Sequence, residues 1–488
     1  MNKIPRREFV KMSGAIGAGL AALPLMSLAT EAENKSTLPN FIVYISDDHG
    51  MLYSEPYGNK DIHTPNLAQL AAEGVIFTHA FNASPSCGPS RNAMLTALWP
   101  ARNGAEPNHK PPKPGVEELP AVLKALGYEV AAIGKVAHNN FAQYYPFDYI
   151  VGPNQGAMGT GEVDKFLTNR DAAKPLCLFF GSHFPHVPWV DNQGYDPATL
   201  TLPPTFVDTP VTREQLTKYY STISKTDALL GEYRALVKKY VPGDSLFIYL
   251  ADHGGQLPFA KWDLYDAGTR VPFIASWPGK LKPGTTNDTM ICLPDLLPTF
   301  IELAGGKVPD GLDGQSFADI FRGTATAHRD HVFNTQSGDG DFNVYPSRSL
   351  RTRDWKYILN LHPEFQHQTH ISRCVAPGGG IQYWKTWLAA AETDPAAAAV
   401  VKRYTVRPAE ELYDLTADPF EQHNLAADPQ HAGRLAAMHA ELKAWMKEQG
   451  DTETVFGKPL LIGQPIVMLK PNGLPANSGT ENGTEPEI

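Results

Sequence analysis

The sequence contains very little cysteine, with four in 488 residues, and no two of them form a CxxC pair: Cys87, Cys177, Cys292 and Cys374. This spacing excludes a disulfide-rich scaffold and a cysteine-based metal site. The chain also lacks an excess of positive charge, because 42 Lys and Arg face 52 Asp and Glu, a formal net charge of −10. A broad basic surface for nucleic acid or an anionic membrane is therefore excluded, and a bound anion must meet a local basic cluster.

Hydrophobic runs long enough to cross a membrane are missing after the N-terminus. The N-terminal stretch "PRREFVKMSGAIGAGLAALPLMSLATEA" has twin arginines, Arg6 and Arg7, then a Gly/Ala/Leu-rich run and small residues near Ala29. This pattern is typical of a twin-arginine export signal, so residues 1–32 are predicted to be removed and the mature protein to be periplasmic or secreted, without membrane contact. A membrane anchor is the alternative, which is disfavoured because the run is short and Pro24 interrupts it.

The rest of the chain is typical of an α/β protein. Hydrophobic residues make up 42% of the composition, enough for a large core, and apolar runs alternate with amphipathic helical patterns. This alternation predicts a large, mostly parallel sheet flanked by helices. Predicted helices include residues 64–74, 119–127 and 213–240. We expect a catalytic α/β domain over residues 38–325, a smaller α+β subdomain over 326–450 and a Pro/Gly-rich tail over 451–488.

Ionisable side chains follow four predicted buried strands. The strands are "FIVYIS", "YEVAAIG", "LCLFFGS" and "LFIYLA", and the residues that follow them are Asp47 and Asp48; Lys135 and His138; His183 and His186; and Asp252 and His253. Open α/β sheets bind ligands at the carboxyl ends of their strands, so these groups are expected to converge. Singly, such aspartates often cap helices or form Asx turns, and a lone histidine is usually structural. Together, however, their charges would repel one another unless something held them in place. A hard divalent cation bound by the aspartates and by an oxygen on residue 87 would do so.

A second group of candidate functional residues lies in "SPSCGPSR", residues 84–91. Pro89 suits the first position of a helix, which would place Cys87 at the amide-rich, positive end of that helix. Arg91 follows one turn later and, with Lys135, is expected to face a bound oxyanion. A small inert thiol at a loop–helix junction explains the cysteine equally well at this point.

These segments carry a resemblance to a known family. "CGPSRNAMLTA" resembles the signature of the type I, formylglycine-dependent sulfatases of the alkaline-phosphatase-like superfamily, C-x-P-S-R followed by x-x-x-L-T. The resemblance runs from about Pro39 to Lys447 and includes "ISDDHG", "AIGKVAH", "HFPHVPW", "LADHGG" and "AKWDLYDAGTRVPF". Within the family, "YPFDY", "LPFAKWDLYDAG" and "RPAEELYDL" are most similar to the heparan N-sulfatase branch.

The resemblance implies cofactors and a set of site residues. A formylglycine-generating enzyme would convert Cys87 to formylglycine, and one calcium ion would be bound. The implied metal ligands are Asp47, Asp48, residue 87, Asp252 and His253, and the implied catalytic residues are Cys87, Arg91, Lys135, His138, His183 and Lys261. Two features depart from many members: the spacing of Lys135 and His138 is K-x-x-H instead of K-x-H, and His253 replaces an Asn, which makes it a softer ligand.

The resemblance also implies a mechanism. Basic side chains and the cation would neutralise the anionic sulfate, and one hydroxyl of the hydrated formylglycine, activated by the metal and Asp252, would attack sulfur. His183 or Lys261 would protonate the leaving atom, and His138 would accept a proton as the second hydroxyl expels sulfate.

The implied function is hydrolysis of sulfate esters or sulfamates of a sulfated carbohydrate. A phosphonate monoester or phosphodiester hydrolase with the same nucleophile is the first alternative, since sulfuryl and phosphoryl groups are similar in shape. A catalytically silent, glycan-binding homologue is the second.

Overall fold

The computed structural model describes residues 38–116, 118–152, 159–376 and 380–476. The predicted export signal and residues 477–488 of the predicted tail lie outside these ranges. In the part of the chain that is described, no helix is long and apolar enough to cross a membrane.

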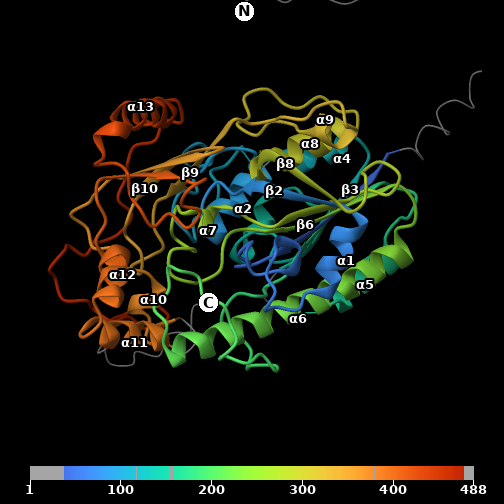
Figure 1. Cartoon of the computed structure of the whole chain (residues 1–488). Coiled ribbons are helices and arrows are strands. Elements are labelled where there is room, and N and C mark those ends of the chain that lie inside the picture. The colour runs from blue at the N-terminus through green and yellow to red at the C-terminus, as the bar shows by residue number, and fades with distance from the viewer. Residues whose placement is uncertain (1–37, 117, 153–158, 377–379, 477–488) are drawn as a thin grey trace, which may run out of the picture. The chain divides into compact units, whose positions relative to one another are not determined.

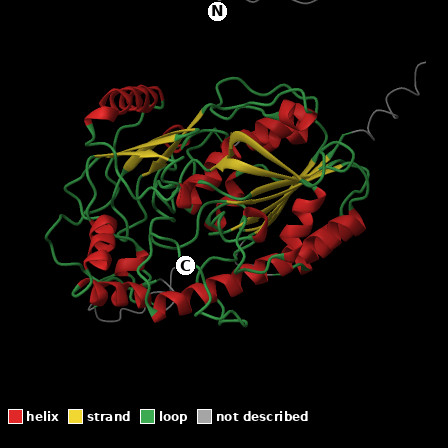
Figure 2. Cartoon of the chain, in the orientation of Figure 1, coloured by secondary structure: helices red, strands yellow, loops and turns green. Residues whose placement is uncertain are grey.

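A large sheet forms the centre of the fold (Figures 1 and 2). Its strands are, in spatial order, β4 Tyr149–Val151, β3 Glu129–Gly134, β5 Leu176–Gly181, β1 Asn40–Ser46, β6 Ser245–Ala251, β7 Phe273–Ser276, β2 Val75–Phe81 and β8 Thr285–Cys292. Only β7 runs antiparallel to its neighbours among these strands. The predicted mostly parallel sheet is confirmed.

Helices cover both faces of this sheet (Figure 1). One face packs on α1 Pro65–Glu73, α5 Gly161–Asn169 and α6 Pro210–Tyr240; the other packs on α2 Cys87–Thr96, α4 Leu119–Ala125, α8 Leu296–Leu303 and α9 Ala318–Arg322. Alternate residues of β1 divide between the two cores, because successive side chains of a strand point to opposite faces. Two short helices, α3 Pro100–Asn103 and α7 Asp266–Thr269, complete this part.

The predicted helices are present as α1, α4 and α6, and the start of α1 depends on a residue that is distant in the sequence. Thr64 precedes α1 without capping it through its side chain. Asp227, from the middle of α6, instead accepts hydrogen bonds from the backbone N–H groups of Asn66 and Leu67 at 3.0 and 2.8 Å. The start of α1 is therefore fixed by a helix far away in the sequence, which satisfies its free donors.

The C-terminal part contains the smaller α+β layer that the sequence predicts. Its antiparallel sheet has the order β12 Glu410–Asp414, β11 Trp355–Asn360, β10 Ser347–Thr352 and β9 His331–Gln336, accompanied by α10 His370–Arg373, α11 Ile381–Ala391, α12 Pro395–Thr405 and α13 Ala432–Glu448. The two parts share a core in which Phe81 and Trp99 pack with Phe333 and Trp445. The boundary at residue 325 stays a prediction.

Residues 451–476 follow α13 and lie against this part. Leu469 is buried, and its backbone is hydrogen-bonded to Arg373 and Val375 at 2.8 and 2.9 Å. This segment brings Pro471, Asn472 and Gly473 to the wall of the main cavity.

Candidate active site

Four strand ends of the large sheet meet at one edge. Asp47 follows β1, Lys135 follows β3, His183 lies two residues beyond β5, and Asp252 follows β6. Because β3, β5, β1 and β6 are consecutive neighbours in the sheet, their carboxyl ends lie side by side. This is the position where α/β folds bind their ligands.

Cys87 lies at the N-terminus of α2, directly at this edge. The helix begins at Cys87 itself, so the expectation that Pro89 occupies its first position is wrong. The side chain of Ser86 makes no cap, and Asn108 Oδ1 accepts the hydrogen bond of the Gly88 N–H at 2.9 Å. Asn108 thus comes from a separate loop to fix the backbone beside residue 87.

The Cys87 sulfur faces basic and acidic groups from three other segments. Its Sγ lies 3.1 Å from His253 Nε2, 3.9 Å from Lys135 Nζ and 4.0 Å from Asp48 Oδ1. Burial, and next the charge of Asp47, raise the pKa of the Cys87 thiol well above its ordinary value. The unmodified thiol is thus protonated at neutral pH and is a poor nucleophile here.

Arg91 connects the residues that follow β1, β3 and β6 through hydrogen bonds. It is fully buried and donates to Asp252 at 2.9 Å, to Asp47 at 3.0 Å, and to the backbone carbonyl of Lys135. Burial disfavours its charge, but these two carboxylates hold its pKa above the usual value. The sequence predicts that Arg91 faces a bound oxyanion. In the structure its hydrogen bonds go to the strand ends, and it does not line the cavity. It therefore orients the carboxylates.

Two lysines neutralise the remaining acidic charge. Lys135 Nζ pairs with Asp47 Oδ2 at 2.5 Å, and Lys261 Nζ donates to both carboxylate oxygens of Asp48 at 3.0 and 2.9 Å. Burial alone would lower the pKa of each lysine, but the aspartates raise both above their ordinary values. Both ammonium groups also line the cavity, where they can meet an anion.

The donor set suits a hard divalent cation. Potential ligand atoms of Asp47, Cys87, Asp252 and His253 lie within 4.8 Å of one another, and so do those of a second set in which Asp48 and His186 replace the last two. Burial raises the pKa of Asp47, but Lys135 and Arg91 outweigh it and keep the pKa well below its usual range. Each set contains two carboxylates, which are donors typical of calcium or magnesium sites, and one softer histidine.

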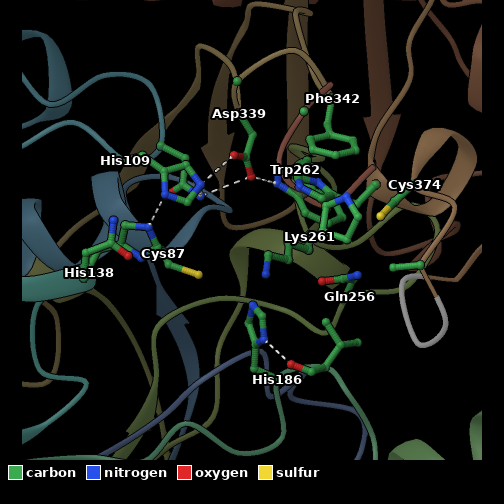
Figure 3. A pocket seen from close by; sticks show the side chains of 18 of the residues that line it. Cys87, His109, His138, His186, Gln256, Lys261, Trp262, Asp339, Phe342 and Cys374 are labelled. Atoms are coloured by element: carbon green, nitrogen blue, oxygen red, sulfur yellow. Dashed lines mark hydrogen bonds and ion pairs between the residues drawn. The ribbon is translucent and has the colours of Figure 1, made fainter. Parts of the chain in front are cut away.

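A cavity of about 740 Å³ lies beside this cluster and is lined by Cys87, Lys135 and Lys261 (Figure 3). Cys87 at the start of α2, and His186 and Lys261 on the loops after β5 and β6, point into it. Asp339, Phe342, His370 and Cys374 come from the C-terminal part. The rings of Trp262, His370 and Phe342 form a stack, with centroids 4.8 and 3.9 Å apart in turn. The cavity thus joins a charged floor to an aromatic wall.

The three histidines near the strand ends have different surroundings. His183 Nδ1 lies 3.9 Å from Asp47 Oδ2, and His186 Nε2 lies 3.9 Å from Asp48 Oδ2. His138 instead contacts His109, with Nε2 of the former 2.8 Å from Nδ1 of the latter. Burial, and next Lys135, lower the pKa of His183 to about 4 and that of His138 well below its ordinary value. Both rings are therefore neutral at pH 7 in this structure.

Comparisons with known proteins show the family of this chain. The family model described as Sulfatase matches residues 39–306, more than half of the chain. The chain belongs to the sulfatase family. This sulfatase is a sulfuric ester hydrolase, as the sequence motifs predict. A second model, described as N-sulphoglucosamine sulphohydrolase, C-terminal, matches residues 254–368 and bears out the resemblance to that branch.

Curated relatives extend over most of the sulfatase. It is 33% identical over 449 residues to an ulvan-active sulfatase of Formosa agariphila, a match that covers 89% of this chain and 86% of the relative. It is 27% identical over 476 residues to the N-sulphoglucosamine sulphohydrolase of Homo sapiens, covering 84% and 90%.

Solved structures show the same fold. A 2-O GAG sulfatase matches with a TM-score of 0.65 at 19% identity, covering 86% of this chain and 95% of that one. The phosphonate monoester hydrolase of Silicibacter pomeroyi matches with a TM-score of 0.63 at 18% identity, covering 85% and 96%. At these identities the likeness concerns the fold alone.

Several residues of the sulfatase's cavity follow no strand of the large sheet and were not predicted as site residues: Asn108, His109, Trp262, Asp339 and His370. His186 is different, because the "HFPH" segment puts it three residues after His183. That spacing was a usable signal for a second histidine. The loop that contains Asp339, "SGDGD", carries no comparable signal.

Proposed function

We propose that this sulfatase removes sulfate from the sulfate esters or sulfamates of a sulfated carbohydrate, with a formylglycine made from Cys87 as its nucleophile. The observation that carries the proposal is the position of Cys87. Its Sγ lies within 4.0 Å of His253, Lys135 and Asp48, at the floor of the cavity. A raised thiol pKa makes the unmodified cysteine unsuited to attack, which favours an oxygen nucleophile at this point.

Two groups would complete the site. Formylglycine, produced by a formylglycine-generating enzyme, would supply a hydrated aldehyde oxygen as nucleophile, and one calcium ion would supply positive charge beside it. The residues that would hold the ion are Asp47, Asp48, Asp252, His253 and residue 87. Hard carboxylate donors at this density fit such an ion, and His253 is the one soft member of the set.

The chain's own cations would bind the sulfate group. Lys135 and Lys261 reach the cavity with their ammonium groups, and both are protonated because Asp47 and Asp48 pair with them. Arg91 would act indirectly by holding Asp47 and Asp252 in place. Neutralising the anion lowers the cost of bringing a nucleophile to sulfur.

Proton transfer would be divided between two sides of the cavity. On one side, Lys261, or His183 once the bound anionic sulfate has raised its pKa, would donate a proton to the departing oxygen or nitrogen. On the other side, His138 would accept a proton during release of sulfate. The neutral state of His138 suits an acceptor, since a protonated imidazole has no free nitrogen lone pair.

The remaining wall suits a sugar. The stack of Trp262, His370 and Phe342 offers flat apolar surface, and Asp341 is an acceptor for hydroxyl groups. Pockets with a few placed polar groups on an aromatic wall are typical of small-ligand sites. The names of the curated relatives, an ulvan-active sulfatase and N-sulphoglucosamine sulphohydrolase, support a sulfated glycan as the substrate class.

The test is sulfate release from a panel of defined N- and O-sulfated saccharides, with phosphonate monoesters and phosphodiesters as the competing arm. We expect release from at least one saccharide at a higher kcat/KM than any phosphorus substrate, and loss of it in Cys87→Ala. A preference for phosphorus substrates would instead favour the phosphonate hydrolase. Saccharide binding without any turnover would favour the silent homologue.

We also propose export by the twin-arginine route, on the pattern of residues 1–32 alone. Replacing Arg6 and Arg7 together by Lys should retain the protein in the cytoplasm of its host, whereas the parent chain is exported. Fractionation of cells that express the two forms measures this. Equal export of both would contradict the route.

A further inference from the structure

A chain of hydrogen bonds leads from the floor of the cavity into the C-terminal part (Figure 3). His138 Nε2 lies 2.8 Å from His109 Nδ1, and His109 Nε2 lies 3.1 Å from Asp339 Oδ1. His138 follows β3, His109 lies on the loop between α3 and α4, and Asp339 follows β9. Three segments that are distant in the sequence thus contribute one group each.

The bonding pattern favours one arrangement of the protons on both rings. Burial opposes the charge of Asp339, but its bond to His109 and the neighbouring His370 keep its pKa below the ordinary value, so it is a carboxylate that only accepts. His109 Nε2 faces both the Asp339 carboxylate at 3.1 Å and the Asn108 Nδ2 donor at 3.2 Å. Because the charged carboxylate is the stronger partner, we place the proton of His109 on Nε2, which leaves Nδ1 as an acceptor. His138 must therefore donate from Nε2, and its Nδ1 holds a free lone pair.

The lone pair on His138 Nδ1 is the part of this chain of hydrogen bonds that could bind a ligand in the cavity. His138 is 5% exposed and lines the cavity with Cys87. Its Nδ1 is buried and has no hydrogen-bond partner among the described residues. Native structures rarely leave a buried polar atom unpaired, so this nitrogen is poised to bind something that enters the cavity.

The two histidines differ sharply in their exposure to solvent. His138 is almost wholly buried, whereas the side chain of His109 is 48% exposed. A proton accepted by His138 cannot reach water from that ring directly, but it can from His109.

We propose that His109 and Asp339 are positioning residues that make His138 a base and conduct its proton to solvent. The proposal rests on the proposed function. His138 Nδ1 would take the proton from a hydroxyl in the cavity, its Nε2 proton would pass to His109 Nδ1, and the resulting His109 cation would be held by Asp339. His109 then loses one proton to water, which leaves both rings neutral and His138 with its proton on Nδ1.

Asp339 is rigid enough for this role. Its other oxygen, Oδ2, accepts hydrogen bonds from Asn108 Nδ2 at 3.1 Å and from Trp262 Nε1 at 2.5 Å. His109 itself has a φ of 61°, in the left-handed region that histidine and asparagine adopt more readily than most other non-glycine residues.

The test uses His109→Asn and Asp339→Asn, each alone and combined with His138→Ala. Asn tolerates the left-handed backbone at position 109 and leaves the bonds of Asp339 to Asn108 and Trp262 in place, so this variant is expected to fold. Glu410→Gln is the matched control, because it breaks another carboxylate–histidine pair, Glu410–His439 at 3.0 Å, outside the cavity.

We expect both single variants to lower kcat about 10- to 100-fold with little change in KM, less than the 10²- to 10⁴-fold of a lost acid or base. The loss should be equal for aryl and sugar sulfates. In the His138→Ala background neither change should lower kcat further, because the residues act as one unit. Glu410→Gln should keep wild-type kcat.

A His109→Asn variant with wild-type kcat would overturn the proposal. So would losses that add fully to that of His138→Ala, since a purely structural role predicts independent effects. If the wild-type enzyme releases sulfate from no substrate, the proposed function itself fails. Normal wild-type turnover with unaffected variants refutes the relay alone.

Discussion

Asp47 is the carboxylate that pairs with two buried cations of the candidate active site. It accepts from Arg91 at 3.0 Å and pairs with Lys135, and all three side chains are buried. We expect Asp47→Ala to abolish turnover and to lower the free energy of unfolding by about 3–5 kcal/mol, because two buried cations lose their partner. Thermal unfolding and turnover assays measure this, with exposed Asp208→Ala, which breaks only a surface pair with Arg213, as the control.

Metal dependence gives that prediction a second readout. EDTA should lower the melting temperature of the wild-type enzyme and calcium should restore it, while Asp47→Ala and Asp252→Ala should respond to neither. Wild-type turnover in both variants would show that the carboxylates serve only the local structure.

The proton donor can be identified by its leaving-group dependence. If His183 protonates the leaving atom, His183→Ala should slow sugar sulfates and sulfamates by about 10²- to 10⁴-fold, but an activated aryl sulfate much less, because its phenolate departs unaided. His138→Ala should slow all substrates alike and release an early burst of alcohol. Stopped-flow assays on both substrate types measure this. Equal leaving-group sensitivity of the two variants, without a burst, would assign the donor role to Lys261.

For individual residues, the sequence predicted the location of a side chain where that residue follows a buried strand. Asp47, Lys135, His183 and Asp252 could be placed at one sheet edge because parallel strands end together. His109 and Asp339 could not, since their meeting depends on how the loop after α3 packs against the loop after β9. Arg91 was placed in the right region, but its burial behind the carboxylates depends on side-chain packing.

A buried ion cluster links elements of the two parts of the fold. Lys356 on β11 pairs with Asp266 at the start of α7 at 2.5 Å and with Glu421 after β12 at 3.2 Å. Burial raises the pKa of Glu421 from an ordinary value of 4.5 to about 7, although Lys356 opposes the shift. Because the folded pKa is the higher one, this group's contribution to stability is full below about pH 4.5 and is lost as the pH rises through 7.

Glu421→Gln should therefore remove part of the stability loss between pH 5 and pH 8, because Gln stays neutral throughout. Denaturant unfolding at both pH values measures the effect, with the exposed Glu448→Gln as the control. A difference from wild type that is the same at both pH values would contradict this explanation.

Helices and strands were predicted where local periodicity determines them. α1, α4 and α6 follow their apolar stripes, whereas the start of α1 depends on Asp227 and the start of α2 lies two residues before Pro89. Element ends depend on long-range partners more than on the residues that flank them. The cluster around Lys356 likewise depends on tertiary contacts that no local pattern contains.

For the whole molecule, the shared core predicts that the large-sheet part does not fold alone. Phe81, Ala93 and Trp99 pack with Phe333 and Trp445, which belong to the C-terminal part. A chain of residues 38–325 would expose this apolar surface and lose the Asp339 wall of the cavity. We expect no cooperative unfolding transition and no sulfate release, in contrast to residues 38–488. Cooperative unfolding with wild-type kcat would show that the two parts are independent.

The overall architecture was predictable from the alternation of strands and helices, but the cavity was not. Its floor comes from strand ends and its wall from segments around residues 339–342, 370–376 and 471–473. The last of these falls in what the composition predicted to be a tail, yet its backbone pairs with Arg373 and Val375. The composition of this segment could not predict these contacts, because backbone hydrogen bonds depend little on residue type.

The central claim is that a formylglycine at position 87 carries the activity. Mass spectrometry of the tryptic peptide 61–91, compared with specific activity across preparations of different modification level, tests it most directly. We predict an aldehyde in place of the thiol in active enzyme, with specific activity proportional to the aldehyde fraction. Full activity in protein whose residue 87 is an unmodified cysteine would contradict it.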